Sequence, residues 1–533
     1  MRATMMDVPL TLTAILDRAA RLFPDIEIVS RRPDRSLHRA TYRDFVERSL
    51  RLANALRAAG LQPGDRVATL MWNHLDHLAT YFGVPCAGGV LHTLNVRLHP
   101  DELAYIATHA GDRFLIVDDV LLPLFERFRG KTHFERVFVV GDPAKAGADT
   151  AFAELLAGAA PDRAALPEVD ERAPLGMCYT SGTTGAPKGV VYSHRSTVLH
   201  SLSTLMADGL GIAQRDTVLP VVPMFHANAW GIPYGAVMAG SKLVMPGPYL
   251  DAPSLLELME GEQVTIAAGV PTIWAAILEQ LDAKHFHLAR GLRMVVGGSA
   301  APESMIRAFD RHGLTVLHAW GMTETSPLGS VAYLRSTDAG RDEDGRYAAR
   351  ARQGYPVAMV EARAIGDAGE VPWDDRTQGE LQVRGPWVAS SYHAQEDAGD
   401  RWTADGWFRT GDVVTVSAEG SLRIVDRTKD LIKSGGEWIS SIELENALVA
   451  HPAVREAVVV AVPHEKWGER PLAAVVLREG ATVTSDELRD ALAARFVKFW
   501  VPDAVVFVDA IPKTSTGKHL KSAVREKFKD HTW

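Results

Sequence analysis

A loop near the middle of the chain, residues 179–191, has the composition of a phosphate-binding segment. It reads YTSGTTGAPKGVV and combines glycines, hydroxyl side chains and Lys188. Glycines let backbone N–H groups approach an anion, and the hydroxyls and the lysine add donors and positive charge. An apolar stretch at 175–179 predicts a strand before the loop, and residues 193–205 predict a helix after it. The loop is not a Walker motif, because Gly189 follows the lysine where that motif needs Ser or Thr.

Four further motifs could carry parts of a nucleotide site. GGSAAP follows an apolar run and lacks bulky side chains, so a flat ring could lie against its backbone. HAWGMTET offers an aromatic ring, a hydroxyl and a carboxylate, which could stack a base, contact a phosphate and hold Mg²⁺ through hard oxygen ligands. In WFRTGD the carboxylate of Asp412 could accept from ribose hydroxyls, and PKTSTGK is a polar loop before a basic helix. Taken singly, each is also compatible with a turn, a buried tryptophan or a solvated tail. They occupy residues 297–302, 318–325, 407–412 and 512–518.

Composition narrows the classes of function. The 533 residues exceed what one core holds, so two or more domains are expected. A net charge of −9 argues against nucleic-acid binding. Cys86 and Cys178 lie in apolar sequence without metal-ligand spacing, which predicts buried thiols in a reducing compartment. The first residues lack the order of a signal peptide, and no run of about 20 apolar residues is present. We therefore expect a cytoplasmic protein without a transmembrane segment.

Elements that could position these motifs alternate along the chain. Residues 65–94 read as strand, helix and strand, and later stretches repeat this order, which predicts α/β architecture with largely parallel sheets. The segments 142–158 and 337–352 are polar or rich in Ala and Gly and are predicted as surface loops.

Composition changes after about residue 425, where the charged run DRTKDLIK begins. The stretch beyond it predicts a mixed α+β unit of ordinary domain size. Its first helix is predicted from Ser440, with Ser440 and Glu443 as a capping box. The expected division is an N-terminal domain over 1–425, a hinge over 426–430 and a C-terminal domain over 431–533.

Together and in this order, the five motifs resemble the adenylate-forming superfamily, which includes acyl-CoA synthetases, firefly-type luciferases and peptide-synthetase adenylation domains. The match runs over about residues 11–527. VVPMFHANAW at 221–230 and IKSGGEWIS at 432–440 look closest to bacterial medium- and long-chain fatty-acyl-CoA synthetases. The resemblance implies a large N-terminal domain of layered α/β subdomains with a small β-barrel-like part. It also implies a small, mobile α+β C-terminal domain.

The implied activity is that of an ATP-dependent acid–CoA ligase using Mg²⁺. A carboxylate attacks the α-phosphorus of ATP to give acyl-AMP and pyrophosphate, and the CoA thiol then displaces AMP. A medium- or long-chain fatty acid is the expected substrate, and a homodimer formed through the N-terminal domain is expected.

The resemblance carries roles over to matching residues. Lys518 is expected to bridge the carboxylate and the α-phosphate, with Thr323 at the α-phosphate and His226 as a further catalytic candidate. Glu324 is the expected Mg²⁺ ligand, and Thr180 a possible second one. The remaining nucleotide and CoA residues fall into groups for the β,γ-phosphates, the adenine slot, the ribose, nearby cations and the pantetheine side. In that order they are Thr180, Ser181, Gly182, Thr183, Thr184 and Lys188; Gly298, Ser299, Ala300, His318, Ala319, Trp320 and Gly321; Asp412 and Arg427; Lys429 and Lys433; and Gly435, Gly436 and Trp438.

Two expectations concern the acid and the hinge. Trp230 matches an aromatic residue that separates the ATP site from the acyl tunnel, and the acyl pocket is expected at Trp230, Ala227, Val270, Ile273 and Val296. The family more often has Tyr than Trp at position 320, which puts hydrogen bonding there in doubt. The C-terminal domain is expected to rotate about Asp426 between the two half-reactions.

Alternatives remain open. An aryl-CoA ligase or a ligase of short or sulfur-containing acids would carry the same motifs. Peptide-synthetase adenylation needs a carboxylate to anchor an amine, and residues 226–235 contain none. A nonenzymatic nucleotide-binding regulator is disfavoured, because plain binding gives Lys518 no purpose.

Overall fold

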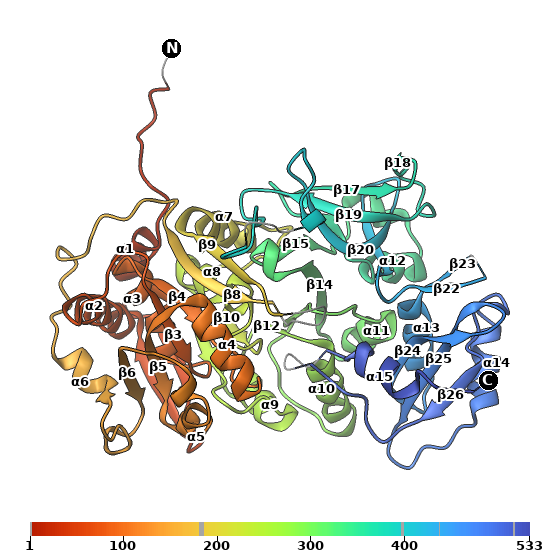
Figure 1. Cartoon of the computed structure of the whole chain (residues 1–533), viewed down its shortest axis with the longest axis horizontal. Helices are drawn as coiled ribbons and strands as arrows, with labels where there is room; N and C mark the ends of the chain where they lie inside the picture. The colour runs from red at the N-terminus through yellow and green to blue at the C-terminus, as the bar shows by residue number, and fades with distance from the viewer. Residues whose placement is uncertain (1–2, 181–185, 396–398, 436, 515–517, 533) are drawn as a thin grey trace.

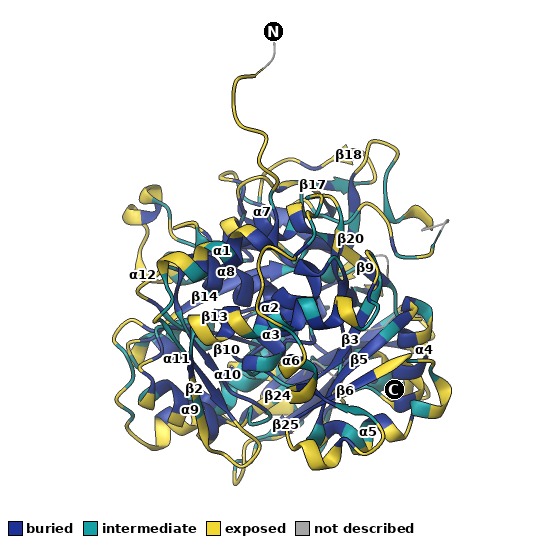
Figure 2. Ribbon diagram, turned by 90° about the vertical axis from the view of Figure 1, so that its left-hand side faces the viewer, coloured by how far each residue is buried: buried dark blue, intermediate teal, exposed yellow. Residues whose placement is uncertain are grey.

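The structure is a computed structural model that describes residues 3–180, 186–395, 399–435, 437–514 and 518–532. Two large sheets and a smaller antiparallel sheet build the N-terminal part, and a compact C-terminal domain lies beside α10 (Pro271–Ala283) and α11 (Glu303–Arg311) (Figure 1). The strands of the large sheets run through the buried interior, and exposed residues gather on the outer helices and loops (Figure 2). The predicted layered α/β fold with a smaller second domain is confirmed.

The first large sheet has seven strands in the order β7-β6-β5-β3-β4-β8-β9. Neighbours are parallel except for β8 and β9, which form an antiparallel pair. Apolar side chains fill the strands that lie between helices, as expected for parallel sheets buried on both faces. The strands are β3 (Arg66–Leu70), β4 (Val90–Thr93), β5 (Asp112–Asp118), β6 (Arg136–Val140), β7 (Thr150–Ala151), β8 (Pro174–Tyr179) and β9 (Gly189–Ser193).

The second large sheet has nine strands in the order β16-β15-β14-β13-β12-β10-β11-β1-β2. Its centre, from β14 to β1, is parallel, and antiparallel strands close both edges. Ligands of parallel α/β sheets bind beyond the carboxyl ends of the strands, and the 297–302 motif follows β13 there. The strands are β1 (Glu27–Arg31), β2 (Leu37–Thr41), β10 (Thr217–Pro220), β11 (Lys242–Met245), β12 (Ile266–Gly269), β13 (Arg293–Val296), β14 (Thr315–Gly321), β15 (Leu328–Val331) and β16 (Tyr355–Pro356).

Helices cover these sheets, and two of them, α3 and α8, are buried on nearly all sides. Helices α2 and α3 pack closely on each other, as do α7 and α8. Besides α10 and α11, the helices of this part are α1 (Leu12–Leu22), α2 (Tyr42–Ala58), α3 (Leu75–Cys86), α4 (Pro100–Ala110), α5 (Leu122–Glu126), α6 (Phe152–Ala157), α7 (His194–Leu205), α8 (Ile232–Ala239), α9 (Ala252–Gly261) and α12 (Glu343–Arg350). Among the described residues, no helix is long and apolar enough to cross a membrane.

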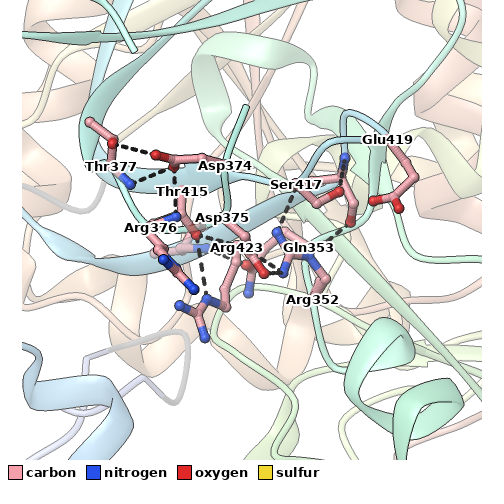
Figure 3. A network of polar contacts seen from close by, with 12 residues as sticks. Arg352, Gln353, Asp374, Asp375, Arg376, Thr377, Thr415, Ser417, Glu419 and Arg423 are labelled. Atoms are coloured by element: carbon pink, nitrogen blue, oxygen red, sulfur yellow. Dashed lines mark hydrogen bonds and ion pairs between the residues drawn. The ribbon is translucent and has the colours of Figure 1, made fainter. Parts of the chain in front are cut away.

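A five-stranded antiparallel sheet follows, in the order β18-β17-β19-β20-β21, in the region where a small barrel-like part is predicted. Arg352, after α12, ties it to the preceding layer by donating to Asp375 and to the hydroxyl of Ser421 (Figure 3). A hollow of about 370 Å³ lies beside this network and is lined in part by Trp373 and Glu419. The strands are β17 (Glu361–Gly366), β18 (Gly369–Glu370), β19 (Gly379–Arg384), β20 (Phe408–Val416) and β21 (Leu422–Arg427).

The C-terminal domain has its own core around the long hairpin of β24 and β25. Strand β22 pairs antiparallel with β23 and β25, and β26 pairs parallel with β25. Its elements are β22 (Ile432–Ser434), β23 (Glu437–Ile439), α13 (Ser441–Val449), β24 (Val454–His464), β25 (Gly468–Leu477), α14 (Ser485–Ala493), β26 (Ala504–Phe507) and α15 (Lys521–Phe528). The exact boundary of the domain and its hinge stay predictions.

Four local expectations need correction. Residues 189–193 form β9, so the phosphate loop joins the two strands of a hairpin, and α7 begins only after β9. An anion in the loop is therefore not placed directly on a helix N-terminus. The segments 142–158 and 337–352, which are predicted as surface loops, contain the short helices α6 and α12. Both segments are polar or rich in Ala and Gly, so the apolar periodicity does not identify these helices. Ser440 caps α13 by accepting from the Glu443 N–H at 3.1 Å, but the reciprocal bond of a capping box is not found among the described residues.

Candidate active site

The neck of the phosphate loop is closed by two hydrogen bonds. The Thr180 N–H donates to the Lys188 carbonyl at 2.9 Å, and the Lys188 N–H donates to Thr180 Oγ1 at 3.1 Å. Because the loop turns back on itself in the hairpin, Thr180 and Lys188 lie side by side. The predicted residues Ser181, Gly182, Thr183 and Thr184 lie outside the described residues.

The predicted adenine slot is built on His318. Its Nε2 accepts from the Ala301 N–H at 3.2 Å, and its Nδ1 donates to the Ala351 carbonyl at 3.1 Å. Burial lowers the pKa of His318 to about 4, so the ring is neutral at working pH and can both donate and accept. His318 therefore fixes the 297–302 loop, while Gly298, Ser299 and Ala300 supply its low wall after β13.

Trp320, Asp412 and Arg427 converge from three strands. Trp320 Nε1 donates to Asp412 Oδ2 at 2.9 Å, and Arg427 Nε donates to Asp412 Oδ1 at 3.1 Å. Asp412 and Arg427 are direct partners in the pairing of β20 with β21. The charge of the nearly buried Asp412 raises the pKa of Arg427. The tryptophan thus supplies a definite hydrogen bond at the position where sequence left the bonding in doubt. Ala319 and Gly321 flank it on β14.

Lys518 reaches this centre from the C-terminal domain. A Cβ built on Gly298 would lie 3.1 Å from Lys518 Cε and 3.8 Å from its Nζ. Burial and the charge of Arg427 lower the pKa of Lys518 to about 8, while Asp412 and Glu324 act in the opposite direction. No ion pair of its Nζ is found within the described part of the chain. An ammonium without a fixed partner, close to a backbone wall, can approach anionic oxygens.

Glu324 and Thr323 lie on a short 3₁₀ turn after β14. The Thr323 carbonyl accepts from Tyr192 Oη at 2.8 Å, and Glu324 Oε1 accepts from Tyr392 Oη at 2.7 Å. Sequence reasoning missed both tyrosines, because they lie outside the five motifs and reach the turn only through the fold. The donor set suits Mg²⁺: no cluster of three or more His, Cys, Asp or Glu that could cage a metal occurs among the described residues. A single carboxylate fits an ion that takes most of its ligands from phosphates and water.

His226 lies where Lys518 can influence it. Burial, with a smaller contribution from the Lys518 charge, lowers the pKa of His226 to about 3. The side chain is therefore neutral at working pH and cannot serve as a general acid in its charged form. With Thr180, Tyr179 and Phe225 it lines a small cavity of about 20 Å³ beside the phosphate loop.

Trp230 lies in an unusual left-handed turn. The φ angles of Ala227, Asn228, Ala229 and Trp230 are 38°, 44°, 50° and 59°, and Gly231 continues the run at 71°. Left-handed helical backbone costs roughly 1–2 kcal/mol per non-glycine residue. The buried indole lies against the adenine-side loop, since a Cβ on Gly297 would be 3.1 Å from its Cη2. A strained wall of this kind is typical of segments that switch or clamp a ligand.

The predicted acyl-pocket residues divide between two cores. Trp230, Ala227 and Val270 pack in one hydrophobic cluster, and Ile273 packs against both this cluster and a second one. Val296 packs in the second cluster, on the opposite face of β13, while its neighbour Val295 belongs to the cluster of Trp230. The alternation of side chains along a strand explains why a one-residue difference changes the face.

The predicted CoA-side residues Lys433, Gly435 and Trp438 lie on the hairpin of β22 and β23. Lys433 Nζ lies 5.3 Å from the ring centroid of Trp438, and the Gly435 N–H donates to the Trp467 carbonyl, so these contacts stay within the C-terminal domain. Strands β22 and β23 lie at its outer edge (Figure 1). Lys429 is closer to the nucleotide residues: burial lowers its pKa, and Asp412 opposes this. Gly436 lies outside the described residues.

Comparison with known proteins follows this geometry. The model of the AMP-binding enzyme family matches residues 16–393, and that of the AMP-binding enzyme C-terminal domain matches residues 443–518. The chain belongs to the AMP-binding enzyme family. It is 49% identical to a long-chain-fatty-acid–CoA ligase of Thermus thermophilus, covering 99% of this chain and 97% of the relative. It is 45% identical to a 3-methylmercaptopropionyl-CoA ligase of Ruegeria pomeroyi, covering 99% of each.

A medium-chain-fatty-acid–CoA ligase of Ectopseudomonas oleovorans is 43% identical over 99% of this chain and 98% of its own. Among solved structures, ATP-bound MatB from Rhodopseudomonas palustris superposes with a TM-score of 0.83 at 26% identity, covering 98% of this chain and 99% of that one. MenE from Bacillus subtilis, in complex with ATP and magnesium, gives a TM-score of 0.79 at 26% identity over 96% and 99%. The predicted family and enzyme class, an acid–CoA ligase, are confirmed.

Proposed function

We propose that this AMP-binding enzyme joins a medium- or long-chain fatty acid to CoA, consuming ATP and releasing AMP and pyrophosphate. The observation that carries the proposal is the close approach of Lys518 to Gly298. At this place the charges of Asp412, Arg427 and Glu324 act on the lysine. Full-length similarity to two fatty-acid–CoA ligases supports the class of acid.

Adenylation brings a carboxylate to the α-phosphorus, so the main physical obstacle is repulsion between two anions. Lys518 is proposed to lie between them and to stabilise the charge that develops in the transition state, with Thr323 at the α-phosphate. Thr180 and Lys188 would hold the outer phosphates, and Asp412 with Arg427 the ribose. His226, which is neutral, would act as a polar contact rather than as a proton donor.

Glu324 is the residue proposed to hold Mg²⁺, with the Thr180 hydroxyl as a second oxygen. The ion supplies neutralisation of phosphate charge when bound. Glu324 is nearly buried, and its Oε1 is already engaged by Tyr392. Its Oε2 is the oxygen proposed to contact the ion.

Thioester formation is proposed to follow a rotation of the C-terminal domain about Asp426. Lys518 lies beside Gly298 in the present arrangement, and the CoA-side residues Lys433, Gly435 and Trp438 belong to the β22–β23 hairpin of the C-terminal domain. Rotation would move Lys518 away from the site and bring the CoA-side residues toward it, so that the thiol can reach the acyl-adenylate.

A sulfur-containing short acid is the second candidate substrate, because the similarity to 3-methylmercaptopropionyl-CoA ligases is as high as that to the medium-chain enzyme. Chain length separates the two: each CH₂ buried in an apolar tunnel contributes about 0.8 kcal/mol, roughly fourfold in affinity.

Pyrophosphate release with a panel of acids tests the proposal. We expect release that depends on both ATP and the acid, with kcat/KM rising from butyrate to dodecanoate. A maximum at 3-methylmercaptopropionate or at an aryl acid would replace the fatty-acid assignment. Release without any added acid, or none with any acid, would contradict the ligase itself.

Two further expectations stay proposals, a cytoplasmic location and a homodimer formed through the N-terminal domain. Light scattering coupled to size-exclusion chromatography tests the dimer, which a mass near that of one chain would contradict.

A further inference from the structure

A short segment between β19 and β20, residues 389–393, connects two parts of the candidate site that are distant in sequence. At its start the Ala389 N–H donates to the Glu324 carbonyl at 2.7 Å. At its end the His393 N–H donates to the Gly189 carbonyl at 2.8 Å, directly after Lys188. The segment thus spans from the proposed metal ligand to the base of the phosphate loop.

Tyr392 is the side chain of this segment that contacts both parts. Its Oη donates to Glu324 Oε1 at 2.7 Å, and Lys188 Nζ lies 4.8 Å from the centroid of its ring. A cation at this distance from an aromatic face is attracted by the ring quadrupole. The hydroxyl of Tyr392 therefore orients an acid while its ring contacts the lysine of the loop.

We propose that Tyr392 is a positioning residue that presets Glu324 for Mg²⁺ and aligns it with Lys188 of the phosphate loop. This inference rests on the proposed function, in which Glu324 holds the ion. It adds a residue that lies in none of the five motifs.

The surroundings hold Tyr392 in place. The ring is 5% exposed and packs edge-on against Trp402, with ring centroids 5.1 Å apart. Trp402 in turn donates from Nε1 to the Ala389 carbonyl at 2.7 Å. Gly189 allows the close approach of the segment to β9, because a Cβ there would lie 3.2 Å from that of His393. A ring fixed on several sides can transmit its position to the carboxylate that it contacts.

The physical reason for such a device is the geometry of Mg²⁺. The ion demands near-octahedral ligands at short distance and tolerates misplacement poorly. A glutamate has several rotamers, and an unanchored one pays entropy on binding the metal. A hydrogen bond to Oε1 removes that freedom and leaves Oε2 for the ion. Loss of such outer partners typically weakens metal binding by about 10- to 100-fold.

Equilibrium binding of ATP, titrated with Mg²⁺ and without acid or turnover, tests the proposal. For Tyr392→Phe, which keeps the ring and removes the hydroxyl, we expect the Mg²⁺ concentration at half-effect to rise about 10-fold. ATP affinity without Mg²⁺ should stay within about twofold, because the ring still contacts Lys188. Excess Mg²⁺ should restore full binding.

Tyr347→Phe is the matched control. Tyr347 Oη also donates to a carboxylate, Asp310 Oδ2 at 3.0 Å, and Arg307 also lies over its ring, with Cζ 4.0 Å from the centroid. This pair joins α12 to α11 outside the candidate site. The control should bind ATP with the Mg²⁺ dependence of the wild type. Circular dichroism and thermal unfolding check that both variants are folded.

A double-mutant cycle with Glu324→Gln separates the possible outcomes. We expect Tyr392→Phe to cause no further shift in the Glu324→Gln background, because the carboxylate through which it acts is absent. If Glu324→Gln shifts the Mg²⁺ titration and Tyr392→Phe does not, the inference is overturned and the proposed function stands. If Glu324→Gln leaves the titration unchanged, the metal role of Glu324 fails, and the inference fails with it.

Discussion

The nucleotide end and the CoA-side hairpin of the candidate site differ in how far they are assembled. Around Gly298, residues from β14, β20, β21 and the C-terminal domain already contact or influence one another. The hairpin of β22 and β23 instead makes its contacts within its own domain. Under the proposed function, this arrangement would serve the first half-reaction, and the second would require a movement.

Removing the cation should affect the assembled half most strongly. For Lys518→Ala we expect acyl-AMP formation to slow by about 10²-fold or more, the usual cost of losing one transition-state donor. Thioester formation from supplied acyl-AMP should remain, because the lysine is proposed to leave before the thiol attacks. Rapid-quench assays of the two half-reactions measure both. Equal loss of the two steps would remove the distinction between the halves.

Restricting the hinge should slow thioester formation more than adenylation, the opposite of the effect expected for Lys518→Ala. Asp426 is almost fully buried, and its Oδ2 accepts from the Ser441 N–H at 2.7 Å, so it joins β21 to α13. For Asp426→Pro, which fixes φ, we expect thioester formation to fall on the order of 10-fold while adenylation is largely kept.

Asp426→Ala is the matched control for the hinge. It loses the bonds to Ser441 but leaves the backbone free to rotate, so both steps should decline together if only stability is lost. Identical profiles for the proline and alanine variants would contradict a hinge at this residue.

If Trp230 closes the acyl pocket, removing its side chain should allow the acid to bind without nucleotide. For Trp230→Ala, fatty acid should bind without ATP about tenfold more tightly than in the wild type, since the closed state no longer excludes it. A fluorescent fatty acid measures this directly. Unchanged affinity in the absence of ATP would mean that the left-handed turn only packs the wall.

The sequence motifs predict the strand ends and loops on which the candidate residues lie, because the type of each element follows from local pattern; the roles of these residues stay predictions. Asp412 and Arg427 are paired across β20 and β21, and Trp320 reaches Asp412 from β14 of the neighbouring sheet. Tyr192 and Tyr392 could not be found in this way, since their partners are set by tertiary packing rather than spacing. Val296 shows a related limit: the apolar run identifies β13, but it does not show that Val295 and Val296 pack in different hydrophobic clusters.

Alkaline pH should weaken the assembled half gradually. The pKa of Lys518 is lowered to about 8, so in the free enzyme the ammonium is present below this pH and is lost as pH rises through it. We expect kcat/KM for ATP to fall up to about tenfold per pH unit above 8. The corresponding fall of kcat with pH should begin at a higher pH, because bound triphosphate favours the charged lysine. Lys518→Arg, whose charge persists, should abolish this fall in whatever activity remains.

The smallest effect is expected at the indole of Trp320. In Trp320→Phe the ring remains, but the hydrogen bond from Nε1 to Asp412 Oδ2 is lost. Such a bond contributes about 1 kcal/mol, so ATP affinity should weaken roughly fivefold. Because Arg427 still holds Asp412, the carboxylate should keep its place, and the rate of the CoA step from supplied acyl-AMP should not change. A larger loss in the CoA step than in ATP binding would place Trp320 in both halves and erase the contrast between them.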